Sequence, residues 1–158
     1  MKNTWLFRTV SCVVLILLLA AGLRLYRIDW DGLIGAHPDE RYIVSVAERV
    51  RDARHLSLFE LAPNFAYGHL VVHLLAFAMG PQGGADPLLV GRVLAALFDV
   101  GTVALTFALG RQVWDRKVAL IAAAFVALLV LDVQQAHFYT SDLPLAFFVL
   151  GALVFAAR

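Results

Sequence analysis

The sequence predicts an all-α, multi-pass membrane helical bundle with juxtamembrane amphipathic helices in its first outer loop. Of the 158 residues, 61% are hydrophobic and only 16% are charged. A soluble domain is about half apolar and about a quarter charged, so this composition is typical of a chain that contacts lipid. The hydrophobic residues also gather in long runs between short polar loops, which is the pattern of a chain that crosses a bilayer several times.

Four apolar segments are expected to cross the bilayer. The first follows Lys2 and Arg8 and resembles a signal peptide, but it continues through Leu25 and precedes further runs. We therefore expect an uncleaved anchor. A spanning helix needs about 20 apolar residues. The four predicted spans are residues 8–26, 88–110, 118–136 and 143–158.

The first outer loop covers residues 27–87 and is expected to hold two surface helices, at 38–54 and 64–79. The second is apolar but short, and it carries Tyr67, His69 and His73. A segment of this length and polarity is typical of an interfacial or re-entrant helix. We expect it to lie at the membrane surface without crossing.

A basic cluster predicts the orientation. Arg111, Arg116 and Lys117 lie between two apolar runs, and loops rich in such residues stay in the cytoplasm. If segment 64–79 does not cross, Asp39 and Asp142 both emerge at the outer face. The opposing observation is that the first outer loop also contains arginines, many of them near acidic residues.

Two functional classes find no support in the composition. The net charge is +1 and no basic stripe with interleaved aromatic residues is present, so nucleic acid is not an expected partner. Cys12 is the single cysteine, which excludes an intramolecular disulfide and a site built from several thiolates.

The most informative polar cluster follows the first span and contains His37, Pro38, Asp39, Glu40 and Arg41. Pro38 suits the first turn of a helix, and acidic residues suit its positive end. Apolar residues recur at helical spacing after them, and this spacing predicts Asp39 in the middle of the apolar stripe and Glu40 at its edge. A carboxylate on that face points to function, while the simpler alternative is that both acids only complement the helix dipole.

Asp142 is the second acidic candidate. Ser141 or Asp142 followed by Pro144 is a common helix start, with a side-chain oxygen that caps free N–H groups. The same position also allows a carboxylate to face a metal ion or a phosphate. His37 leaves a similar choice open between a helix cap and a hydrogen bond to a donor phosphate.

Charged residues within the predicted spans need partners. Arg92 and Asp99 are seven residues apart on one helix face, about 10 Å along the axis, so they cannot touch. Each is expected to find a partner on another helix, for a functional or a purely structural purpose. His69 and His73 have a spacing that metal ligands use, but the polar edge of an interfacial helix is the preferred interpretation.

In this order, the motifs resemble the N-terminal part of a GT-C fold membrane glycosyltransferase, of the protein O-mannosyltransferase and aminoarabinose-transferase type. The resemblance covers most of the chain, and no single piece of it is specific. The matching pieces are the anchor span, the acidic pair at 37–40, the segment 64–70, the arginine-led span start at 91–97, the loop 109–116 and the segment 139–148.

The resemblance implies transfer of a sugar from a polyprenyl-phosphate-linked donor to an acceptor at the outer face of the plasma (inner) membrane, with inversion at the anomeric carbon. Asp39, with Glu40 beside it, would be the catalytic carboxylate that handles the proton of the acceptor hydroxyl. Asp142 would help to hold a divalent ion such as Mg²⁺ or Mn²⁺, or the donor phosphate. The expected substrate-binding residues are His37, Arg41, Tyr67 and Arg92.

Two departures and two alternatives accompany this prediction. Enzymes of this type have many more spans, so the chain is expected to be a fragment that is inactive alone, and their second acidic element is often two acids where Asp142 stands alone. One alternative is a non-enzymatic small multi-pass membrane protein or partner subunit. The other is part of a secondary transporter with Arg92 and Asp99 on the substrate path.

Overall fold

The computed structural model describes residues 2–53, 65–81 and 84–158, and all regular structure within them is helical. Residues 54 and 64, which end and begin the two predicted surface helices, lie outside the described part. The helices are α1 (Lys2–Leu25), α2 (Pro38–Ala53), α4 (His69–Met79), α5 (Pro87–Val113), α6 (Arg116–Leu128), α7 (Val130–Gln135) and α8 (Asp142–Ala156).

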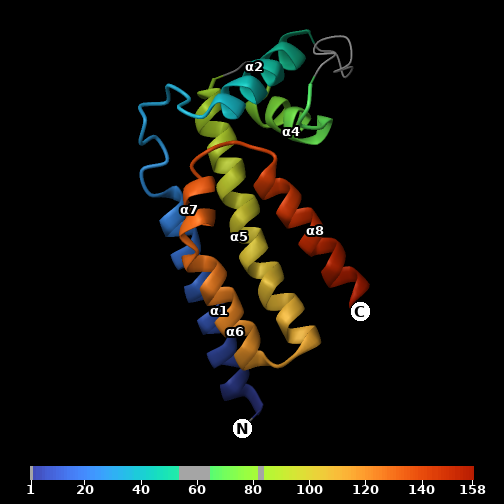
Figure 1. The fold of residues 1–158 in the computed structure, drawn as a ribbon. Helices are drawn as coiled ribbons and strands as arrows, with labels where there is room; N and C mark the ends of the chain where they lie inside the picture. Colours follow the sequence, from blue (N-terminus) through green and yellow to red (C-terminus); the bar gives the residue numbers. More distant parts are fainter. Residues whose placement is uncertain (1, 54–64, 82–83) are drawn as a thin grey trace.

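The long helices form a bundle with a cap at one end (Figure 1). Helices α1, α5 and α6 lie side by side, and α8 runs beside α5 on the other flank. Helices α2 and α4 lie across the end of the bundle where α5 begins. The connection between α5 and α6 and the N-terminus of the chain lie at the opposite end. The predicted all-α fold class is therefore confirmed for the described residues.

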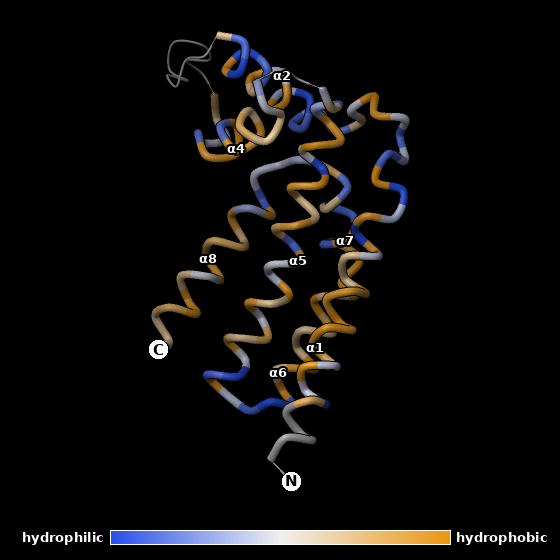
Figure 2. The backbone as a smooth tube through the Cα atoms, turned by 180° about the vertical axis from the view of Figure 1, so that it is seen from behind, coloured by the Kyte–Doolittle hydropathy of each residue, from blue (hydrophilic) through white to orange (hydrophobic). Residues whose placement is uncertain are grey.

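Buried charged residues and exposed apolar ones occur together in this structure. Figure 2 shows apolar residues along the bundle and hydrophilic ones at the cap and in the α5–α6 connection. Four charged side chains, Arg24, Glu40, Arg92 and Asp99, are at most 1% exposed. Large apolar side chains point outward, which suits a lipid surround. Examples are Phe7, Val10, Leu15, Leu18, Leu97, Ile121, Phe125, Leu145, Val149 and Phe155.

Within the described residues, two helices are long and apolar enough to cross a membrane. They are Phe7–Leu25 and Pro87–Val113. They agree with two of the four predicted spans, residues 8–26 and 88–110. Helix α8, with 15 residues, is apolar but shorter, and so is α4 with 11. The spans at 118–136 and 143–158 stay predictions.

The predicted helix over 118–136 is wrong in one respect, because it is broken at Leu129. Helix α6 ends at Leu128, and Leu129 adopts an extended conformation before α7 begins. Arg24 donates to the carbonyl oxygens of Ala127 and Val126 at 2.9 and 3.2 Å. A cation that binds the last carbonyls of a helix compensates for the interrupted backbone bonds.

Small residues allow α5 to approach its neighbours closely. A Cβ at Gly110 would lie 2.9 Å from the Cα of Ala119 on α6, and one at Gly101 would lie 2.6 Å from the Phe147 ring on α8. Buried Ala119, Ala123 and Ala127 continue the contact along α6. Small residues at helix interfaces are typical of membrane bundles.

The cap has its own apolar core between α2 and α4. Ile43, Val46, Val72 and Leu75 are completely buried there. The second surface helix begins later than predicted, at His69, because Gly68 precedes it with a φ of 74° that favours glycine. Tyr67 therefore lies in the connection before α4 and not on the helix.

Candidate functional site

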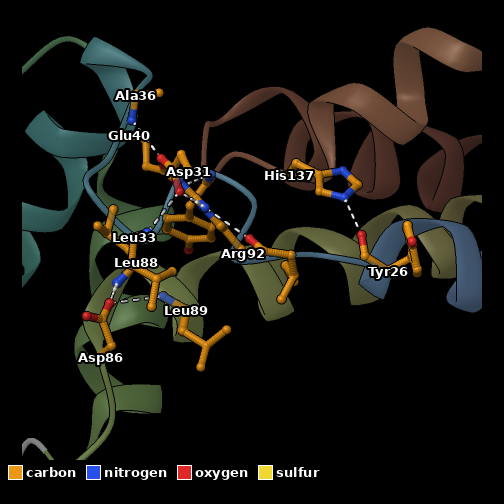
Figure 3. Close-up of polar contacts among 12 residues, drawn as sticks. Tyr26, Asp31, Leu33, Ala36, Glu40, Asp86, Leu88, Leu89, Arg92 and His137 are labelled. Atoms are coloured by element: carbon orange, nitrogen blue, oxygen red, sulfur yellow. Dashed lines mark hydrogen bonds and ion pairs between the residues drawn. The ribbon is translucent and has the colours of Figure 1, made fainter.

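A buried arginine joins the cap to the bundle (Figure 3). Arg92, on α5, donates to both Glu40 carboxylate oxygens at 2.9 Å. It also donates to the two Asp31 oxygens at 2.7 and 2.8 Å and to the Ile28 carbonyl at 3.0 Å. These bonds use all five guanidinium N–H groups. We call Asp31, Glu40 and Arg92 the Arg92 joint.

Further bonds fix both carboxylates of the Arg92 joint. The Tyr139 backbone N–H donates to Glu40 at 2.9 Å, which ties the α7–α8 connection to α2. Asp31 accepts from the backbone N–H groups of Leu33 and Ala36, both at 3.0 Å. The hydrogen bond from Arg92 is the main reason that the pKa of Asp31 is held well below its ordinary value.

The predicted positions of the two neighbouring acids on α2 are reversed. Glu40, placed by the sequence at the edge of the apolar stripe, is completely buried, whereas Asp39 is only half-buried. The reason is that Glu40 pairs with Arg92, and this pair sets the rotation of the first turn of α2. Both Glu40 oxygens are occupied, so Asp39 is the acid that remains accessible at this turn.

Asp39 belongs to a cluster made by three chain segments. Tyr67 hydrogen-bonds to Asp39, and this bond, followed by desolvation and the nearby charges of Asp39 and Asp142, raises the pKa of Tyr67. Asp39 lies in the first turn of α2, Tyr67 in the connection before α4, and Asp142 in the first turn of α8. We call these three residues the acidic surface site.

Two aromatic residues hold Tyr67 in place. The ring centroids of Tyr42 and Phe65 lie 6.3 and 5.8 Å from that of Tyr67, and 5.4 Å from each other. The contacts are edge-on or tilted, as aromatic side chains prefer. Tyr42, 38% exposed, presents part of its ring beside the acids. The sequence pattern gave no reason to choose Tyr42 or Phe65.

A groove of about 400 Å³ opens beside the acidic surface site, between α4 and α8. Tyr67 belongs to both the site and the groove wall. The rest of the wall is mainly apolar, with a few polar groups near the site. The lining residues are Ala66, Tyr67, Gly68, His69, Leu70, Val71, Ser141, Pro144, Leu145 and Phe148.

His37 and Arg41 flank the start of α2. The Asp39 backbone N–H donates to Nδ1 of His37 at 3.2 Å, and the His37 ring packs on Phe138 with 5.1 Å between centroids. Of the two interpretations of His37, this contact favours the helix cap. Arg41 is exposed, and its aliphatic stem crosses Gly35, where a Cβ would lie 2.6 Å from the Arg41 Cγ.

The region around Asp142 differs from the expected helix start. Ser141 is the N-cap residue of α8 but makes no side-chain capping bond. Asp142 is exposed and accepts a hydrogen bond from the Thr140 hydroxyl at 3.3 Å. Within the described residues, no group of three or more acidic, histidine or cysteine side chains is arranged to hold a metal ion.

The other predicted polar residues make contacts within the protein. Asp99 pairs with Arg24 of α1, with 2.5 Å between Nε of Arg24 and Oδ2 of Asp99. The sequence pattern did not indicate Arg24 as this partner. The rings of His69 and His73 stack with 6.2 Å between centroids, and Nδ1 of His73 lies 2.8 Å from the His69 carbonyl oxygen. Arg24, the partner of Asp99, and Asp31, a partner of Arg92, lie on either side of the end of the first span. Their charge next to an apolar run was the signal that could have identified them.

Comparison of the chain with protein-family models, curated proteins and solved structures finds no match. Function is therefore argued from the fold and the site geometry.

Proposed function

We propose that this chain is the first part of a multi-pass membrane glycosyltransferase that takes a sugar from a polyprenyl-phosphate donor, with Asp39 as the catalytic carboxylate. The observation that carries the proposal is the acidic surface site. Asp39, Tyr67 and Asp142 come from three separate segments and meet at the end of a lipid-facing bundle, beside an apolar groove.

The proposed reaction is an inverting displacement. The carboxylate of Asp39 accepts the proton of an acceptor hydroxyl while that oxygen bonds to the anomeric carbon of the sugar. The bond from this carbon to the phosphate oxygen breaks, and polyprenyl phosphate leaves with the bonding electrons. A half-buried carboxylate at the first turn of α2 is accessible to an acceptor and held in position by the helix.

The surroundings of Asp39 support this assignment. The groove offers an apolar surface that suits a carrier lipid, and Tyr67 connects that groove to Asp39. In the proposal, Tyr67 orients the carboxylate through its hydroxyl, and Tyr42 offers an aromatic face to a sugar ring. In the proposal, Arg41 contributes positive charge and the other ring nitrogen of His37 a hydrogen bond toward a phosphate.

Glu40 and Arg92 take a different role from the one first expected. Both are completely buried, and their charged groups bind each other. We therefore place them as positioning residues that fix the first turn of α2, and with it Asp39. The transporter alternative is disfavoured by the same contacts, because every N–H group of Arg92 is already bonded within the protein.

A divalent cation is an expectation from the resemblance, and the described residues offer it few ligands. Asp142 is the acid best placed to contact one, together with oxygens of a donor phosphate, since Mg²⁺ usually keeps several non-protein ligands. No step of the proposed reaction requires the ion. The proposal places the site at the outer face of the plasma membrane.

The test is transfer of radiolabelled sugar from polyprenyl-phosphate donor in membranes from cells that carry each variant in the native gene. Asp39→Asn is expected to lower the rate by about 10²–10⁴-fold, the usual contribution of a general base. The control is Asp52→Asn, an exposed acid on the same helix, which should keep the rate. Full activity in Asp39→Asn, or no transfer by the unmodified protein, would favour the non-enzymatic alternative.

A further inference from the structure

The second end of the bundle holds a cationic pocket that the proposed reaction does not use. It lies at the α5–α6 connection, has a volume of about 440 Å³ and is lined by Arg111, Trp114, Asp115, Arg116 and Lys117. Three cationic side chains face one carboxylate. We call these five residues the basic pocket.

The carboxylate in the basic pocket, Asp115, caps the N-terminus of α6. Asp115 is the N-cap residue and accepts from the backbone N–H groups of Lys117 and Val118 at 2.7 and 3.0 Å. These bonds, and to a smaller extent the nearby charges of Lys117 and Arg116, lower the pKa of Asp115, so it stays ionised at the helix N-terminus. The pocket therefore has a net positive charge, which favours an anion.

Two of the lining residues relate the pocket to the membrane. Arg116 donates to the Thr9 hydroxyl on α1 at 3.1 Å, which fixes the start of α6 against the first span. Trp114 is 67% exposed at the end of α5, a helix that is long and apolar enough to cross a bilayer. Exposed tryptophan beside basic residues at a span end is typical of the headgroup region.

We propose that the basic pocket binds the phosphate of an anionic glycerophospholipid, with Arg111 and Lys117 as its main cationic contacts and Trp114 against the glycerol and upper acyl region. Basic pockets between membrane helices at the cytoplasmic surface bind anionic headgroups by this combination of charge and depth. The site requires only that the α5–α6 connection lie at a membrane surface. It does not depend on the proposed sugar transfer.

The test uses quenching of Trp114 fluorescence by brominated lipid. The full chain, with Trp5→Phe and Trp30→Phe so that Trp114 is the only tryptophan, is placed in phosphatidylcholine vesicles. Brominated phosphatidylglycerol or brominated phosphatidylcholine is then added at equal mole fraction. Bromine at the same acyl position in both lipids makes the difference in quenching a measure of headgroup preference.

Phosphatidylglycerol is expected to quench more strongly, and the preference should fall about fivefold with each cation removed, in Arg111→Gln and in Lys117→Gln. Added salt should weaken the preference in the unmutated pocket, a readout that needs no variant. Arg8→Gln is the matched control. It removes an exposed positive charge from α1, and Arg8 is not one of the residues that line the pocket.

Three results would overturn the proposal. Equal quenching by the two lipids would show that the pocket has no headgroup preference. An equal loss of preference in Arg8→Gln would assign the effect to general surface charge. If millimolar free glycerol phosphate abolished the preferential quenching by brominated phosphatidylglycerol, the ligand would be a soluble phosphate and not a lipid.

Discussion

The guanidinium of Arg92 has a coordination that no other side chain can reproduce. Its five N–H groups bind two carboxylates and one carbonyl oxygen within the Arg92 joint. A lysine has three donors on one nitrogen, so it cannot hold two carboxylates in the same geometry. The joint therefore depends on arginine and not only on positive charge.

Replacement of Arg92 is expected to loosen the cap strongly. Arg92→Met leaves the Glu40 carboxylate buried without its partner, at a cost of about 3–5 kcal/mol, and Arg92→Lys should recover only part of it. Thermal unfolding in detergent, followed by circular dichroism, measures the loss. Arg158→Met, at an exposed position, is the control. Equal stability of Arg92→Met and the unmodified protein would contradict a structural role for the joint.

Asp31 makes the stability of the cap depend on pH. Its folded-state pKa lies well below the unfolded value of about 3.9, because Arg92 donates to it. The stabilisation is therefore fully present above the unfolded pKa and is lost as the pH falls through the folded pKa. Unfolding by denaturant at pH 7, 5, 4 and 3 should show the steepest loss below about pH 4.

The contribution of Asp31 to this pH profile can be separated from that of other acids. Asp31→Asn should lower stability at pH 7 and flatten the loss between pH 4 and 3, since the amide does not titrate. Asp86→Asn gives a comparison with an exposed acid that only caps α5. An unchanged slope in Asp31→Asn would assign the acid sensitivity to other carboxylates.

The environment of a residue was most predictable from the sequence where one physical requirement determined it. That Arg92 and Asp99 each need a partner on another helix is confirmed, since a buried charge is costly without one. The identity of the partners was not predictable, because 52 to 75 residues separate them along the chain. The positions of Asp39 and Glu40 came out reversed because the long-range pair with Arg92 outweighs the apolar periodicity of α2.

At the scale of the elements, apolar runs predicted the helices well and their interruptions poorly. Helices α1 and α5 agree with predicted spans to within a few residues at most ends. The break at Leu129 carries neither proline nor glycine, so the local sequence gives no signal for it. Its stabilisation comes from Arg24, which is about 100 residues away and binds the carbonyl groups at the end of α6.

The close contact between α5 and α6 predicts that one added methyl group at Gly110 lowers stability. In Gly110→Ala the new Cβ would meet the Ala119 backbone at 2.9 Å, and backbone cannot move aside as a flexible side chain can. We expect a loss of about 1–3 kcal/mol, the usual effect of overpacking, in thermal unfolding in detergent. Gly22→Ala is the matched control, a helical glycine with open space around it, which should be neutral or slightly stabilising.

For the whole molecule, the distribution of polar groups predicts a position in the bilayer. Helix α5 has 27 residues and is therefore about 40 Å long, enough for a hydrocarbon core of about 30 Å. The hydrophilic residues of α2 and of the α5–α6 connection lie at opposite ends of the apolar bundle (Figure 2). The two acidic elements at α2 and α8 both lie at the cap end, so insertion with α5 across the bilayer would put them at the same membrane face in either orientation.

Labelling of single cysteines determines which face this is. In a Cys12→Ser background, Ser45→Cys on α2 and Ser141→Cys before α8 report on the cap end, and Lys117→Cys reports on the basic end. A membrane-impermeant thiol reagent on intact cells should label the first two and leave the third unlabelled until the membrane is opened, because basic loops stay in the cytoplasm. Labelling of Lys117→Cys alone would show that the protein has the opposite orientation, with Asp39 in the cytoplasm and away from an outer-face acceptor. Labelling of all three from outside would show that α5 does not span, and the membrane placement of both proposed sites would fail with it.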